Sequence, residues 1–388
     1  MNKITLYIIL GFASLWVTSC VSYKAQYSED WKNQNKQIDD PYFTLYLIGD
    51  AGNAPMDSST FVFDYLKKQL DKETANSGII WLGDNIYPVG LAPTDSPYHA
   101  EGKHRLMAQL RTMDNYKGYK YFVPGNHDWY TYGRVGLRRQ ELAVDSFLMN
   151  TPNPNNQNNF FLPDKGCGDP TMHELASDIN LILMDSHWFL NDKAKSGDQS
   201  VCEVTNQGEY IKKLKSEIES VKDQTVILAS HHPPYTYAHH GGKFPLKDDL
   251  FPLTQVVDWL YLPLPLLGTA LNRTRTFVSE QDVNNPNYKL YRNMIVDLMD
   301  RQGRGIIASG HEHTLQFIEK ENQYFIVSGA GTKNNKVGMG DGSKFSIGEK
   351  GYVKVTFYDP QKAYVEFIVP SKSDNTSPVS FDQVIELK

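Results

Sequence analysis

Short apolar runs, separated by amphipathic stretches, constrain the fold of this chain more than any other feature of its sequence. The runs are four to six residues long, and most are followed by a Gly-Asp, Gly-Asn or Gly-His pair. Runs of this length that are apolar on both faces are typical of strands buried inside an α/β sheet. We therefore predict buried strands at residues 43–48, 79–82, 119–123, 181–184, 225–229 and 305–308.

The segments between these runs have the periodicity of helices. In residues 138–149, for example, Leu142, Phe147 and Leu148 recur at roughly helical spacing. On this pattern we expect helices at 60–75, 104–113, 138–149, 207–221 and 288–301. After the last buried run the segments alternate or run apolar, with turn residues between them, which favours antiparallel strands at 314–319, 323–328, 352–358 and 363–369.

The first twenty residues have the features of an export signal. Lys3 precedes an apolar run at residues 4–17, which is too short to span a bilayer comfortably. The small residues before Cys20 resemble a bacterial lipobox, so we expect cleavage after residue 19 and lipidation of Cys20. A plain secretory signal with an incidental cysteine is the alternative. The lipoprotein interpretation predicts an exported, membrane-anchored protein, in the periplasm or at the cell surface.

Residues 20–40 are polar and lack apolar periodicity, which predicts a tether between the anchor and a domain that spans 41–388. The chain has 39 Lys and Arg residues against 45 Asp and Glu residues, for a formal net charge of −6. This balance indicates no basic surface for nucleic acid. If Cys20 is acylated, Cys167 and Cys202 are the cysteines that remain, and an oxidising compartment would favour a disulfide between them over two free thiols.

Five polar clusters lie at or just beyond the carboxyl ends of predicted strands, where ligands usually bind in α/β sheets. They supply carboxylate, amide, phenol and imidazole groups, a donor set that suits iron, zinc or manganese. The clusters are Gly49-Asp50-Ala51-Gly52, Gly83-Asp84-Asn85-Ile86-Tyr87, Gly125-Asn126-His127-Asp128, Ser230-His231-His232-Pro233-Pro234 and Gly310-His311-Glu312-His313.

In this order the five clusters resemble the motifs of the calcineurin-like metallophosphoesterases. Two features are similar to the purple acid phosphatase branch, of the small tartrate-resistant acid phosphatase type: Tyr87 in Gly-Asp-Asn-x-Tyr, and the run Gly-His-Glu-His-Thr-Leu-Gln from Gly310. The resemblance covers about residues 42–358. It implies an α/β metallophosphoesterase fold, a four-layer sandwich in which helices flank two mixed β-sheets.

The resemblance also implies a dinuclear metal site. The first ion would be held by Asp50, Tyr87 and His313, and the second by Asn126, His231 and His311, with Asp84 bridging both. A phenolate ligand favours a trivalent ion, so Fe(III) is expected at the Tyr87 site, with Fe(II), Zn(II) or Mn(II) at the other.

The implied activity is hydrolysis of phosphate esters, most simply phosphomonoesters as in an acid phosphatase. In such a site two metal ions would clamp the phosphate and would supply a bound hydroxide as the nucleophile. His127 matches the histidine of the family that contacts substrate and can protonate the leaving group. His240, nine positions after His231, matches a second such histidine, although it could also be a surface residue in a turn.

Neighbouring polar residues are expected to support the site. We interpret His232 as flanking it, Asp128 as orienting His127 or its loop, and Asp185-Ser186-His187 as structural, because no partners for a nucleophile triad are visible.

An apolar insertion at about 241–287 departs from the family pattern. It starts directly after His240, so we expect a lid or substrate wall, with an oligomer interface or a satellite core as alternatives. Two rival functions stay open. One is a phosphodiesterase or nucleotide pyrophosphohydrolase on the same metal core, and the other is a non-catalytic lipoprotein that binds metal or a partner.

Overall fold

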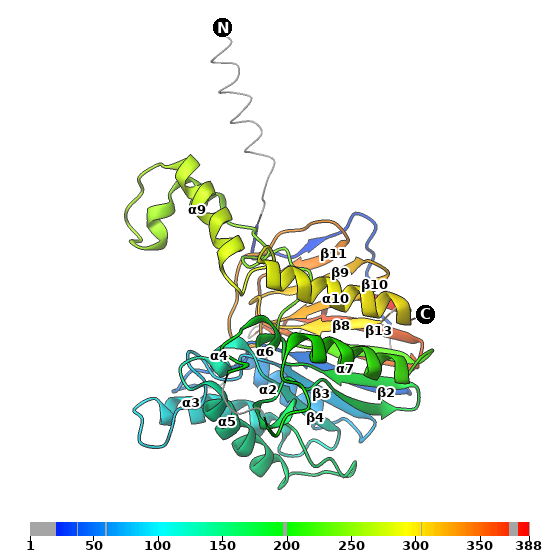
Figure 1. Cartoon of the computed structure of the whole chain (residues 1–388). Coiled ribbons are helices and arrows are strands. Elements are labelled where there is room, and N and C mark those ends of the chain that lie inside the picture. The colour runs from blue at the N-terminus through cyan, green and yellow to red at the C-terminus, as the bar shows by residue number, and fades with distance from the viewer. Residues whose placement is uncertain are drawn as a thin grey trace.

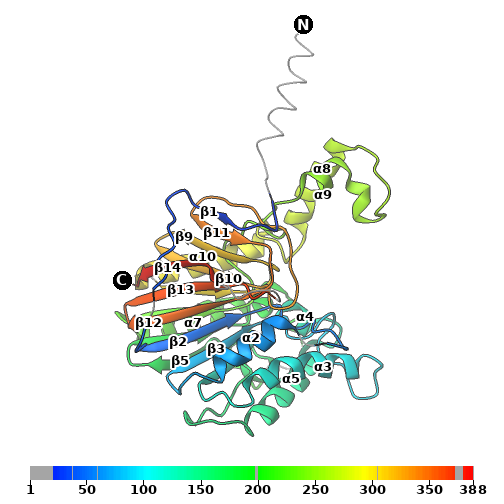
Figure 2. The ribbon, with the colours of Figure 1, turned by 180° about the vertical axis from the view of Figure 1, so that it is seen from behind.

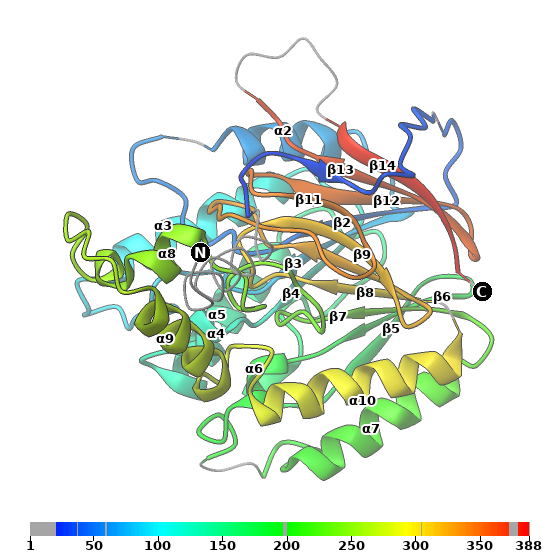
Figure 3. The ribbon, with the colours of Figure 1, turned by 90° about the horizontal axis from the view of Figure 1, so that it is seen from above.

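Two mixed β-sheets pack face to face at the centre of the computed structural model, and helices cover both outer faces (Figures 1 and 3). The structure describes residues 21–36, 38–58, 60–196, 200–303, 305–371 and 379–387. The layering confirms the expected α/β fold of two mixed sheets flanked by helices. Cys20 and the apolar run at 4–17 lie outside the described residues.

The first sheet has the strand order β14-β13-β12-β2-β3-β4. Its parallel half, β2, β3 and β4, is joined through β2 to an antiparallel half. The strands are β2 (Phe43–Ile48), β3 (Ser77–Leu82), β4 (Tyr119–Val123), β12 (Tyr352–Asp359), β13 (Lys362–Ile368) and β14 (Val379–Glu386). On its outer face lie α2 (Phe61–Leu70), α3 (His99–Leu110) with η1 (Arg111–Met113), and α5 (Gly133–Leu148) (Figure 2).

The second sheet has the order β1-β11-β9-β10-β8-β7-β6-β5. Its strands are β1 (Gln26–Tyr27), β5 (Thr171–Ala176), β6 (Ile179–Leu183), β7 (Thr225–Ala229), β8 (Ile306–Ser309), β9 (Leu315–Lys320), β10 (Gln323–Ser328) and β11 (Ser343–Ile347). Two long helices, α7 (Gln207–Ser220) and α10 (Pro286–Gln302), run side by side along its outer face (Figure 3).

Strand β2 shows why the central strands are apolar on both faces. Leu45 and Leu47 belong to the core between the two sheets, whereas Tyr46 and Ile48 belong to the core under the helices. Successive side chains of a strand point to opposite faces, so a strand covered on both faces needs an unbroken apolar run. This is the pattern from which the sequence predicts the strand.

The segment expected as a tether over 20–40 is bound to the domain over much of its described part. Gln26 and Tyr27 pair with β11, and the Trp31 ring stacks on Phe381 with centroids 5.6 Å apart. The indole Nε1 of Trp31 also donates to the Asp382 carbonyl, 3.0 Å away. Backbone pairing, ring contacts and hydrogen bonds therefore hold this segment against the domain.

Cys167 and Cys202 form the expected disulfide. The insertion forms a projecting arm, residues 241–285, that contains α8 (Leu246–Leu250), η3 (Pro252–Gln255) and α9 (Pro265–Val278) (Figure 1). Helix α9 begins at Pro265, because a proline at the first helical position loses no intrahelical hydrogen bond. No helix in the described ranges has both the length and the apolar character to cross a bilayer.

Candidate metal centre

The site residues occupy loops at the carboxyl ends of strands from both sheets. Asp50 follows β2, Asp84 follows β3, and Asn126 opens the short helix α4 (Asn126–Trp129) just after β4. His231 and His311 follow β7 and β8 of the other sheet. Parallel strands that lie side by side bring such loops to one edge of the fold.

One group of side chains gathers around the carboxylate of Asp50. The Tyr87 hydroxyl donates to Asp50 Oδ1 over 2.7 Å and lies 2.9 Å from Nε2 of His313. The same His313 nitrogen is 3.4 Å from Asp50 Oδ1. A carboxylate, a phenol and an imidazole therefore present their ligand atoms to one point, where they could hold a metal ion.

A second group gathers around His231. Its Nε2 atom lies 3.0 Å from Asn126 Oδ1 and 3.2 Å from Nδ1 of His311. All three side chains are buried. An amide oxygen and two imidazole nitrogens thus converge, and they could hold a second metal ion.

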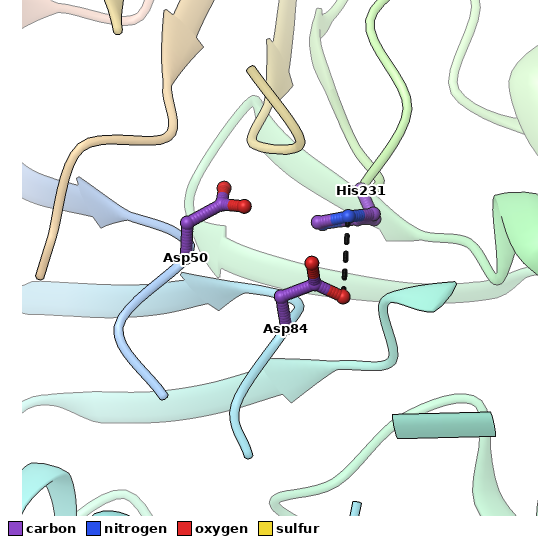
Figure 4. A group of neighbouring side chains, drawn as sticks. All are labelled: Asp50, Asp84 and His231. Atoms are coloured by element: carbon purple, nitrogen blue, oxygen red, sulfur yellow. Dashed lines mark ion pairs between the residues drawn. The ribbon is translucent and has the colours of Figure 1, made fainter. Parts of the chain in front are cut away.

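Asp84 lies beside the second group and within reach of the first. Its Oδ1 atom is 3.4 Å from Nε2 of His231 (Figure 4). One ligand atom each from Asp50, Asp84 and His231 falls within 4.8 Å of the others. Burial alone would raise the pKa of Asp84, but the charge of His231 holds this pKa well below its usual range, so the carboxylate is ionised.

The backbone at these ligands adopts conformations that side chains usually avoid. The φ angles are +53° at Asp50, +53° at Asp84 and +69° at His311. A Cβ atom at Gly125 would lie 2.3 Å from Asp84 Oδ1, so only glycine fits there. Non-glycine residues in this region cost free energy and cluster at functional sites.

Hydrogen bonds from outside the groups fix the imidazole rings. Nδ1 of His231 lies 2.8 Å from the Leu82 carbonyl, which leaves Nε2 to face the site. Nε2 of His311 lies 3.0 Å from the Gln281 carbonyl, which leaves Nδ1 to face the site. Carbonyl acceptors of this kind orient metal-binding histidines and set their tautomer.

The donor set fits a pair of metal ions. Two buried carboxylates, Asp50 and Asp84, lie in a low-dielectric region where an ionised group needs a compensating charge. Oxygen and imidazole donors are the ligands that iron, zinc and manganese accept. Each of the two groups could therefore hold one ion, and the carboxylate of Asp84 could be shared by both ions.

The two expected catalytic histidines lie beside these groups. Nδ1 of His127 is 2.7 Å from the Pro88 carbonyl, and its Nε2 is 4.0 Å from Asp84 Oδ2. The ring of His240 lies on that of His311, with centroids 4.1 Å apart. Its Nδ1 is 2.6 Å from Asp282 Oδ1, so Nδ1 of each histidine is held by a protein oxygen.

The neighbouring residues mostly support loops. Asp128 accepts hydrogen bonds from the backbone nitrogens of Gly125, Asn85 and Ile86, and so ties together the loops that carry Asn126 and Asp84. Burial raises the pKa of Asp185, the N-cap of α6 (Ser186–Leu190), to about 7.

A nucleophile role for this segment is not supported. Ser186 Oγ contacts His232 Nδ1 at 2.8 Å, but the serine is fully buried and no carboxylate holds this histidine among the described contacts.

Sequence reasoning missed three residues at the site. Gln281 and Asp282 reach His311 and His240 from the end of the arm, and Lys333 places its Nζ atom 3.9 Å from the centre of the Tyr87 ring. Nothing in the sequence marks the first two, which stand in the insertion. Lys333 follows Gly329-Ala330-Gly331, a turn whose small residues allow β10 to approach Asp50 closely.

The comparisons with known proteins agree with this architecture. A family model described as calcineurin-like phosphoesterase matches residues 43–315. Among curated sequences, none is similar enough to count as a relative.

Three solved structures are similar to this chain to different degrees, and two of them have TM-scores above 0.5. GAP50, the anchor in the inner membrane complex of Plasmodium, is 14% identical with a TM-score of 0.54, over 90% of this chain and 90% of that chain. PhoD is 11% identical with a TM-score of 0.53, over 90% of this chain and 70% of that chain. The purple acid phosphatase PPD1 from yellow lupin (Lupinus luteus) seeds is 13% identical with a TM-score of 0.48, over 89% of this chain and 53% of that chain. At these identities the likeness concerns the fold alone.

Proposed function

The chain belongs to the calcineurin-like phosphoesterase family, and on that premise we propose that it is a phosphomonoesterase of the acid phosphatase type with a dinuclear metal site. The observation that carries the proposal is the completeness of the ligand set. Two groups of three donors meet beside one ionised carboxylate, Asp84. A non-catalytic relative would be expected to lack at least one of these donors.

Asp50, Tyr87 and His313 would hold one ion, Asn126, His231 and His311 the other, and Asp84 both. Fe(III) is the ion we propose for the phenolate site, with Fe(II), Zn(II) or Mn(II) beside it. Such a pair, when bound, neutralises charge on the phosphate and activates water at neutral or acidic pH.

The chain's own residues would bind the substrate and move protons. His127 and His240 each have one ring nitrogen held by the protein, which orients the other toward the space beside the ligands. Each could donate a hydrogen bond to a phosphate oxygen, and one of them could protonate the leaving alkoxide. The ammonium of Lys333 adds positive charge beside Tyr87, which favours an anionic ester.

The test is purification without chelators, followed by metal analysis and assays on phosphomonoesters, phosphodiesters and nucleotides across pH. Two metal ions per chain and a preference for monoesters are expected. A preference for diesters or nucleotides would favour the phosphodiesterase alternative. Two ions without turnover on any phosphate ester would contradict an enzyme and favour a binding protein.

The chain is proposed to work outside the cytoplasm, held to a membrane by lipid on Cys20. The support is the apolar run at 4–17 with its lipobox-like end, and the disulfide between Cys167 and Cys202, which needs an oxidising compartment.

A further inference from the structure

The arm, residues 241–285, carries an exposed apolar surface away from the metal centre. Within residues 256–271, Asp258 is the only charged residue. The side chains of Val256, Trp259 and Leu266 are 84%, 76% and 84% exposed. The expected lid residues therefore do not pack over the ligands, and the arm projects beyond the two sheets (Figures 1 and 3).

The burial pattern of helix α9 is the reverse of the pattern usual for a helix on the surface of a water-soluble domain. The helix buries small and polar residues along one stripe, and the buried Asn272 donates to Asp249 Oδ1 over 2.8 Å. Apart from Arg273, Thr274 and Arg275, the exposed residues of this helix are apolar. The buried stripe is Gly268, Asn272 and Thr276, and the exposed apolar residues are Leu266, Leu267, Leu271, Phe277 and Val278.

Two arginines border the apolar side of α9. At 3.6 residues per turn, Arg273 and Arg275 fall on opposite edges of the arc formed by the exposed apolar residues. Long basic side chains at the edge of an apolar helix face can keep their charge in water while the face enters an apolar phase. Helices that lie in the membrane interface have this arrangement, often with Trp and Leu on the buried side.

The arm stands at the same end of the molecule as the start of the described chain (Figures 1 and 2). Ser22 forms a β-bridge with Val337, and the next residue, Gly338, donates to the Tyr237 carbonyl just before the arm. A lipid on Cys20, two residues before Ser22, would thus bring the arm to the membrane.

We propose that the apolar side of α9 and the tip at residues 256–267 insert into the surface of a lipid bilayer. The choice of a bilayer rests on the proposed anchor at Cys20 and on the burial pattern of α9. The arm has four basic against five acidic residues, so the binding energy comes from apolar burial rather than from anionic lipid headgroups. Neutral phosphatidylcholine is therefore a sufficient ligand.

The test uses a chain of residues 21–388, which contains both sheets and both cores and has no lipid or signal segment. Flotation with phosphatidylcholine vesicles should recover this chain at both low and high salt. A variant with Val256→Ser, Trp259→Ser and Leu266→Ser should bind at least about 100-fold more weakly, given the apolar area lost. Because these side chains are exposed, the variant should keep its phosphatase activity and its melting temperature.

A matched variant removes three exposed apolar side chains at the opposite end of the molecule: Val135→Ser, Leu142→Ser and Met149→Ser. It should bind vesicles like the unmodified chain. A second measurement uses vesicles whose lipids carry brominated acyl chains. These lipids should quench part of the tryptophan fluorescence of the unmodified chain, and this quenched part should be absent from the variant Trp259→Ser.

Absence of vesicle binding, or equal binding by the two triple variants, overturns the proposal. A dimer in sedimentation that the arm variant alone loses, without vesicle binding, would also overturn it, because the apolar side would then cover a second copy of this chain. Because the readout is binding, neither result depends on the proposed phosphatase activity.

Discussion

The Nε2 atom of His231 lies 3.0 Å from Oδ1 of Asn126, although 105 residues separate the two in sequence. His231 comes from the end of β7 in one sheet, and Asn126 from the end of β4 in the other. The centre therefore lies across the seam between the sheets. Neither sheet carries all of the proposed ligands, so the proposed site forms only when the two sheets have packed together.

The shared carboxylate gives the first prediction. Asp84→Asn removes the negative charge that would face both ions, so the variant should lose metal and at least about 10³-fold in kcat/KM. Metal analysis and turnover of a phosphomonoester measure both effects. Asp282→Asn is the control, because Asp282 contacts His240 and no proposed ligand, and it should keep its metal. Full metal content in Asp84→Asn would contradict the bridging role.

The second prediction concerns colour. If Tyr87 binds Fe(III) as a phenolate, the iron-loaded protein should absorb visible light through charge transfer from the phenolate to the iron. Tyr87→Phe should abolish this band with little change in stability, because the ring volume is nearly kept. Tyr130→Phe should keep the band, since the Tyr130 hydroxyl contacts Asn126 Nδ2 and not Asp50. A colourless protein with stoichiometric Fe(III) would argue against the assignment.

The central strands could be predicted from sequence because burial on both faces leaves an unbroken apolar run. Strands β2, β7 and β10 lie inside their sheets and match their predicted bounds, as does the start of α7 at Gln207. Strand β4 lies at a sheet edge but is buried over most of its length, and its bounds also match. Edge strands that are open to solvent leave no such signal. Most residues of β5 are partly exposed and Glu174 is exposed, so the sequence shows no unbroken apolar run there. The same holds for β14, in which Asp382 is buried by contacts with Gln34 and Tyr364 that lie far away in sequence.

The place of the candidate ligands in the fold could be predicted because each lies within five residues of the end of a strand, so local sequence sets its position at the sheet edge. Gln281 and Asp282 could not, since their position depends on how a 45-residue arm returns to the domain. The arm's outward direction was equally hidden. An apolar stretch such as 256–271 is compatible with a lid, an interface or a membrane contact until the neighbours of Gly268, Asn272 and Thr276 are known.

Lipidation gives the third prediction. Cys20→Ser should fail to incorporate labelled fatty acid, and washing should release it from membranes that retain the unmodified protein. Its specific activity should not change, because Cys20 precedes the first described residue of the domain. An intact mass of the native protein that shows no acylation, or a mature chain that begins at another residue, would exclude the anchor.

The disulfide gives the fourth prediction. Cys167 and Cys202 are 35 residues apart. In the chain-entropy model, closing a loop of this size stabilises the folded state by about 3–4 kcal/mol. Replacing both cysteines by alanine should lower the free energy of unfolding, measured by urea denaturation, by about this amount. Adding reductant to the unmodified protein should lower this free energy to a similar extent. Metal content should be preserved, because neither cysteine contacts a proposed ligand. Equal stability with and without reductant would mean that the thiols are free in solution.

The last prediction separates metal binding from proton transfer. His127→Ala and His240→Ala should both keep two metal ions, because the held nitrogens of these rings bind Pro88 and Asp282 rather than a ligand. If one of them protonates the leaving alkoxide, its loss should slow alkyl phosphates by roughly 10²–10⁴-fold, the usual contribution of general acid catalysis. Nitrophenyl phosphate should be affected far less, since nitrophenolate leaves without a proton. Asp282→Asn should reproduce a weaker form of the His240 effect, because it loosens the ring without removing it. Equal losses for all leaving groups would mean that the histidines bind phosphate and transfer no proton, and loss of metal in either alanine variant would overturn the ligand assignment.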